Sequence, residues 1–97
     1  MKTPDRSTVS RLEDLPNIGP AMAKDLRLLG IHHPQQLTGR NAYQMHSELC
    51  RLSNKQHDPC VIDVFLAAVD FMEGGTPRPW WDFTEERKTY LSGRFIK

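Results

Sequence analysis

The sequence has only two cysteines among its 97 residues and contains no long run of apolar side chains. The second absence excludes a membrane-spanning helix, which needs about 20 consecutive apolar residues. The N-terminal residues 1–6 lack the apolar core of a secretory signal peptide. We therefore expect a cytoplasmic protein in which Cys50 and Cys60 are reduced thiols. A chain of this length forms one domain that can bury a small core without disulfides or a metal.

The chain also lacks a surplus of charge of either sign. Thirteen Lys and Arg nearly balance twelve Asp and Glu, which leaves a net charge of +1. Nucleic-acid-binding domains usually carry an evident basic surplus, so affinity for DNA would depend on local bias. Bases gather in or near residues 19–40 as Lys24, Arg27, His32, His33 and Arg40. Acids follow on a later helix as Asp63, Asp70 and Glu73, and we expect them to form a solvated stripe rather than a metal site.

Familiar catalytic patterns are missing as well. The sequence shows no Ser-His-Asp arrangement, no Gly-Lys phosphate loop and no pair of carboxylates set in an apolar pocket. We therefore expect a protein that is not an enzyme and that has no cofactor and no small-molecule substrate.

Apolar spacing predicts an all-α fold, a compact bundle of about five helices with no sheet. Residues 1–7 are predicted to be a flexible tail and residues 8–97 a single domain. The expected helices run from near Thr8 or Ser10 to Leu15, then over 20–29, 41–53, 59–73 and 85–91, with a single turn at 35–37. The segment 59–73 is apolar over so wide an arc that we expect it to be the central helix.

The most informative segment is residues 15–26, which predict a tight turn followed by a helix with a bare amide end. Asn17 tolerates a left-handed conformation, Gly19 can adopt angles closed to most residues, and Pro20 suits the first helical turn. Such a helix start favours an anion such as phosphate, and a nearby lysine adds positive charge. The predicted phosphate-binding residues are Asn17, Gly19, Ala21, Met22 and Lys24.

An alternative for this segment is a structural turn in a protein-interaction domain. One hairpin supplies few phosphate contacts, so DNA binding by it would be weak and salt-sensitive. The second helix pair, 41–53 and 59–73, is joined by a loop without glycine and could complete a two-hairpin architecture without binding DNA. A protein partner or a dimer would then have to add contact area.

Residues 15–31 resemble the helix-hairpin-helix motif of DNA-repair and DNA-binding proteins. The usual pattern is hydrophobic, Gly, hydrophobic, Gly and then an Ala-rich helix that closes with Gly-Ile. Here Asn17 replaces the first glycine, and Gly30 with Ile31 closes the helix. The resemblance implies contact with DNA phosphates without sequence specificity. In some members backbone carbonyls also bind a monovalent cation, and the corresponding positions here are Glu13, Leu15 and Ile18.

Further positions extend the resemblance over roughly residues 9–90. They are Leu15–Pro20, Gly30-Ile31, Leu37–Gly39, Tyr43, Leu49-Cys50, Asp58–Val61 and Pro79–Trp81. Together they look like the small bacterial pathogenicity-locus or mitomycin-resistance-type proteins, a family similar to the C-terminal domain of the competence regulator TfoX. The resemblance implies a SAM-domain-like helical arrangement and a role in DNA repair, damage resistance or competence.

Two further groups of residues have more than one interpretation. His46, Cys50, His57 and Cys60 are a legitimate zinc-ligand set, but we favour two small buried cysteines that face each other, with exposed histidines. Cys60 begins a helix, where the dipole lowers a thiol pKa, although a core position is the simpler interpretation. The pair Trp80 and Trp81 could stack on nucleobases, yet such a pair more often pins a tail onto a helical core.

Overall fold

The computed structural model describes residues 9–93, and this part of the chain contains helices and no strand. Four α-helices form the domain, α1 (Pro20–Leu28), α2 (Ala42–Ser53), α3 (Cys60–Met72) and α4 (Thr84–Gly93). Three 3₁₀ turns separate or precede them, η1 (Leu12–Asp14), η2 (Pro34–Leu37) and η3 (Trp80–Phe83). The all-α prediction is confirmed, while the predicted N-terminal tail, residues 1–7, lies outside the described residues.

Within residues 9–93, the segment of the first predicted helix forms a single 3₁₀ turn, so this part of the chain has four α-helices instead of about five. The Asp14 carboxylate turns back and accepts the backbone N–H groups of Ser10 at 3.1 Å and Arg11 at 3.0 Å. These two hydrogen bonds lower the pKa of Asp14. These bonds cap the start of η1. The turn ends at Asp14 because Leu15, which precedes Pro16, is extended.

Capping side chains fix the starts of the two longest helices. Asn41 Oδ1 accepts the N–H groups of Tyr43 at 2.9 Å and Gln44 at 3.1 Å, where α2 begins. Asp58 Oδ1 accepts the Cys60 N–H at 2.8 Å where α3 begins. The α2 helix ends at Ser53, and its C-cap residue Asn54 has a left-handed φ of 55°. The helix start predicted from Asp58 and the following proline is therefore confirmed.

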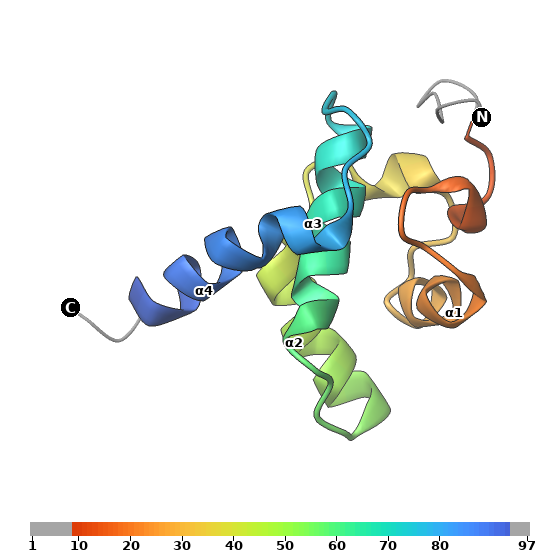
Figure 1. Cartoon of the computed structure of the whole chain (residues 1–97). Helices are drawn as coiled ribbons and strands as arrows, with labels where there is room; N and C mark the ends of the chain where they lie inside the picture. The colour runs from red at the N-terminus through yellow and green to blue at the C-terminus, as the bar shows by residue number, and fades with distance from the viewer. Residues whose placement is uncertain (1–8, 94–97) are drawn as a thin grey trace.

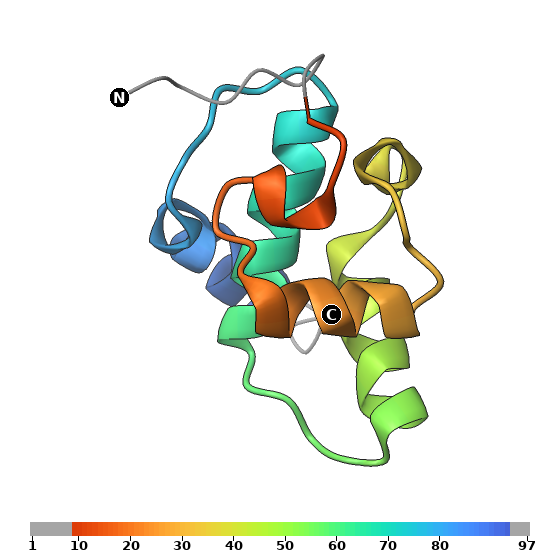
Figure 2. The same cartoon turned by 90° about the vertical axis from the view of Figure 1, so that its right-hand side faces the viewer.

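The helix α3 runs through the middle of the molecule, with α1 and η1 on one side and α2 packed along its lower half (Figure 1). Figure 2 shows α1 crossing in front of α3. Phe65 and Ala68 on α3 are fully buried, and the core around them takes side chains from η1, α1, η2 and α2. This arrangement confirms that segment 59–73 forms the central helix. No described helix has the length and apolarity that crossing a membrane requires.

The helix α4 projects away from the rest of the molecule (Figure 1). The molecule as a whole measures 42 × 27 × 21 Å along its principal axes. Its first turn packs on the domain, and further along the Tyr90 ring stacks on Tyr43 of α2 with centroids 3.7 Å apart. Tyr90 itself is 44% exposed. The helix α4 is thus attached to the domain by its first turn and by the stack of Tyr90 on Tyr43.

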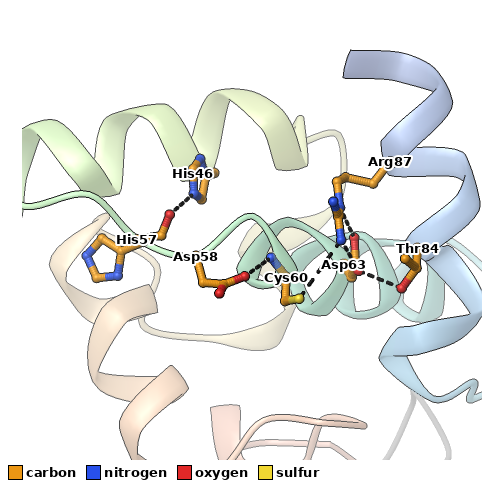
Figure 3. Close-up of polar contacts among 7 residues, drawn as sticks. All are labelled: His46, His57, Asp58, Cys60, Asp63, Thr84 and Arg87. Atoms are coloured by element: carbon orange, nitrogen blue, oxygen red, sulfur yellow. Dashed lines mark hydrogen bonds and ion pairs between the residues drawn. The ribbon is translucent and has the colours of Figure 1, made fainter. Parts of the chain in front are cut away.

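The predicted solvated acidic stripe is wrong for Asp63, which is completely buried. Its carboxylate accepts hydrogen bonds from Arg87 Nε at 3.0 Å, Arg87 Nη2 at 3.2 Å and Thr84 Oγ1 at 2.8 Å (Figure 3). The hydrogen bond from Arg87 to Asp63 raises the pKa of the guanidinium. Of the other two acids, Asp70 is half-buried and Glu73 is exposed, where it accepts the Gly39 N–H at 2.7 Å.

Candidate functional site

The segment between η1 and α1, here called the hairpin, turns tightly at Asn17, whose φ of 68° is left-handed. The Asn17 side-chain amide donates to the carbonyl oxygen of Arg78 at 2.8 Å, a contact between residues 61 positions apart. The hairpin is therefore joined to the segment that leads into η3. At the far end of α1, Gly30 has a φ of +85° and the Ile31 N–H donates to Leu26 O at 2.9 Å. These are the features of a glycine C-cap, as the sequence predicts.

The expectation of a special backbone conformation at Gly19 is wrong. Its φ of −96° and ψ of −173° are extended backbone that any residue can adopt. A Cβ atom at this position would meet nothing within 4 Å. The residue that requires the left-handed turn is Asn17, two positions earlier. Gly19 instead serves as the N-cap of α1, and it brings no side chain that could bond the free amides.

The N-terminal end of α1 is open to an anion. Gly19, Pro20 and Ala21 are exposed, and no acidic residue lies in the first turn. Within the described chain, no group accepts the N–H of Ala21 or Met22. Free amides at the positive end of a helix dipole favour a negative charge. The structure thus brings together the backbone groups that the sequence assigned to phosphate.

The charges near the hairpin are fewer than the sequence suggested. Lys24 is exposed, and in the described part of the chain no carboxylate pairs with it. Arg27 is paired with Glu13 at 3.3 Å. The Glu13 pKa is lowered by a backbone hydrogen bond and by Arg27. Arg40 is half-buried and lines a cavity of about 320 Å³ that also holds acidic side chains, those of Asp70, Glu73 and Glu86.

Arg78 is a cation near the hairpin that sequence reasoning missed. Its guanidinium lies 4.3 Å from the centre of the Phe83 ring, and its Nε is 3.5 Å from Asp82 Oδ2. Its carbonyl oxygen accepts the Asn17 side chain. Nothing in the local sequence brings Arg78 to a turn 61 residues earlier, because that contact depends on the tertiary fold.

The carbonyl groups predicted to bind a monovalent cation lie on the hairpin and just before it. Leu15 O accepts the Ile18 N–H at a long 3.3 Å, and none of the described donors is bonded to the carbonyls of Glu13 or Ile18. Neutral carbonyl oxygens are ligands that a hard cation accepts, so the cation site stays a prediction for these three residues. A bound cation would add positive charge beside the amide end of α1.

The proposed zinc set does not come together. The His57 N–H donates to Cys50 Sγ at 3.3 Å, and His46 Nε2 lies 3.0 Å from the His57 carbonyl oxygen. The Cys60 sulfur instead lies 3.9 Å from Arg87 Nη2 (Figure 3). Over residues 9–93, no three His, Cys, Asp or Glu side chains are placed to hold a metal ion.

The favoured alternative for these residues also needs correction. Both cysteines are half-buried rather than buried, and both histidines are half-buried rather than exposed. The Asp58 carboxylate, through a hydrogen bond to the thiol, raises the pKa of Cys60. The expectation that the helix start lowers this pKa is therefore wrong, because a carboxylate at the same helix end disfavours the thiolate.

The aromatic cluster at η3 divides into an anchor and an exposed ring. Phe83 is buried, Trp80 is half-buried, and Trp81 is 61% exposed. The two indole rings meet at 83° with centroids 5.6 Å apart. The prediction that both tryptophans pin the tail is wrong for Trp81, because Phe83 provides that anchor.

Comparisons with known proteins identify the family. The model of the pathogenicity locus family (Cdd1) matches residues 5–89. The chain is also similar to a protein of Streptomyces lavendulae named mitomycin resistance protein McrB, with 36% identity over 84 residues, which cover 87% of this chain and 80% of the relative. No solved structure shows a significant match. On a match of this extent, the chain belongs to the pathogenicity locus family.

Proposed function

We propose that the protein binds DNA through backbone phosphates at the hairpin, without reading the base sequence. The observation that carries the proposal is the open N-terminal end of α1, with the free amides of Ala21 and Met22 and no acidic residue in the first turn. One phosphate oxygen placed there would accept backbone N–H groups and lie at the positive end of the helix dipole. Lys24, exposed one turn along, supplies a charge for the same or the next phosphate.

The comparison with a mitomycin resistance protein supports a cellular setting for this activity. We place the DNA contact within resistance to DNA damage, with repair and competence as related settings. The affinity of a single hairpin is low, because counterion release scales with the number of phosphates contacted. Dimerisation or a protein partner would raise it by adding a second contact.

A protein-interaction adaptor is the alternative function. Such a domain would be expected to show a contiguous exposed apolar patch. The exposed large hydrophobic residues of the described chain lie instead on four separate elements, as Leu28, Leu52, Trp81 and Tyr90. No single element of the described chain therefore presents an exposed stripe of large hydrophobic side chains.

A matched pair of charge reversals tests the proposal. Lys24→Glu should weaken binding to a duplex several-fold at low salt and reduce the size of the salt slope by about 1, because one phosphate contact is lost. Lys88→Glu makes the same change in net charge on α4, which projects away from the hairpin (Figure 1), and should leave affinity nearly unchanged. Equal losses in the two variants would show that binding follows net charge and not the hairpin.

A further inference from the structure

An exposed aromatic side chain lies close to the hairpin, although the two are far apart in the sequence. The bond from the Asn17 side chain to Arg78 O, at 2.8 Å, fixes the segment before η3 against the turn. Figure 2 shows η3 and the segment entering α1 on the same side of α3. Trp81 follows Arg78 by three residues, so its backbone lies within about 10 Å of that contact.

Trp81 is held in place while most of its ring remains open to solvent. Its neighbour Trp80 contacts it at 83° with centroids 5.6 Å apart, and Phe83 anchors the turn in the core. An indole that is 61% exposed on an anchored turn has a surface available for stacking. The fold has no evident need for this exposure, because Phe83 already provides the apolar anchor.

One cation, Arg78, belongs to the segment that runs from the Asn17 contact to Trp81. Its side chain is 43% exposed, and its guanidinium is positioned by Phe83 and Asp82. The hydrogen bond from the Asn17 side chain to the Arg78 carbonyl oxygen holds this segment against the hairpin. The segment from the Asn17 contact to Trp81 thus offers one partly exposed cation and one exposed aromatic ring close to the hairpin.

We propose that Trp81 is a stacking site for an unpaired nucleobase next to the phosphate held by the hairpin. The preferred substrate is then DNA in which unpaired bases adjoin a duplex, rather than a continuous duplex. This inference rests on the proposed function of the hairpin. Because the Trp81 backbone lies within about 10 Å of the Asn17–Arg78 contact, an unpaired base a few nucleotides from the held phosphate can reach the ring. In a continuous duplex the bases are stacked on one another and cannot take this position.

The test compares two DNAs with the full chain. One is a blunt duplex, and the other is the same duplex with a short single-stranded thymine overhang. Because stacking contributes about 1–3 kcal/mol per base, the overhang DNA should bind between about fivefold and about a hundredfold more tightly. Trp81→Ala should abolish this preference and leave duplex affinity unchanged, whereas Trp81→Phe should keep part of it.

Two controls separate this inference from the proposed function. Tyr90→Ala removes another exposed aromatic ring, on α4, and should preserve the preference for the overhang. Lys24→Glu should weaken the binding of both DNAs to a similar degree. Equal affinity of the unchanged protein for the two DNAs overturns the stacking site and leaves the hairpin contact standing. Absence of binding to both DNAs overturns the hairpin function and the inference with it.

Discussion

At the scale of single residues, Asp63 is a buried polar group that joins α3 to α4. It is completely buried, and Arg87 and Thr84 supply three hydrogen bonds to its two carboxylate oxygens. A buried carboxylate costs free energy unless it is paired and hydrogen-bonded. Asp63 meets both conditions only because α4 begins where its first turn can deliver Thr84 and Arg87 together.

Asp63→Ala should lower the free energy of unfolding by about 3–5 kcal/mol, because it leaves the Arg87 guanidinium buried without its partner. Urea denaturation followed by circular dichroism measures the change. Glu48→Ala is the control, since it breaks the exposed pair with Arg51 at 3.5 Å and should cost less than about 1 kcal/mol. Similar losses in the two variants would mean that the Asp63 cluster adds no more than a surface ion pair.

Glycine substitutions give a second prediction at this scale. Gly19→Ala should change the free energy of unfolding by less than about 1 kcal/mol, because the backbone is extended and the space for a Cβ is open. Gly30→Ala should cost about 1–2 kcal/mol, because a φ of +85° is strained for an L-residue. Thermal melts of both variants check the order, and a larger loss at Gly19 would show that the hairpin geometry described above is incorrect.

These residues also show what the sequence could and could not predict. Asn17 was predicted correctly because a left-handed turn is a local property that asparagine tolerates. The prediction for Gly19 is wrong because a glycine in a turn does not always adopt a conformation that other residues avoid. Here Gly19 is extended, and its lack of a side chain leaves the amides of α1 without a cap. Asp63 was misassigned because its partners come from a helix more than twenty residues later, and helical spacing alone does not reveal them.

At the scale of elements, local sequence signals determine where the helices begin and end. How each helix is attached to the domain depends instead on tertiary contacts. The starts of α2 and α3 depend on side chains within two or three residues, Asn41 and Asp58, and the sequence predicts both starts within a residue or so. The projection of α4 depends on which of its turns find tertiary contacts. Arg87 and Tyr90 make such contacts in the described structure, while Lys88 and Thr89 are exposed.

Hydrogen exchange should show this difference within α4. The backbone amides of α3 should be the most protected, because that helix is surrounded by the core. Amides of α4 beyond Arg87 should exchange much faster, since a short helix without tertiary packing is marginal in water. Tyr90→Ala should speed the exchange of those amides further by removing the stack on Tyr43. Uniform protection of the backbone amides along α4 would contradict the weak attachment of its C-terminal part.

At the scale of the whole molecule, the proposed DNA binding depends on the local placement of charge on a nearly neutral chain. The net charge is +1, and Arg27 and Arg87 are each paired with a carboxylate. Lys24 is exposed on α1, and Arg78, whose backbone carbonyl contacts Asn17, shares its charge with Asp82. A protein with so few unpaired cations near the hairpin can neutralise only a few DNA phosphates. The slope of log K against log salt should therefore be small.

The most direct test of the central claim is the affinity for duplex DNA of two unrelated sequences, measured across a salt series. The hairpin account predicts weak binding of equal strength to both sequences, with a slope of log K against log salt of about −1 to −3. Fluorescence anisotropy of labelled duplexes gives both quantities in one titration series. Undetectable binding at low salt, or a clear preference for one sequence, would contradict the claim that the hairpin binds the DNA backbone.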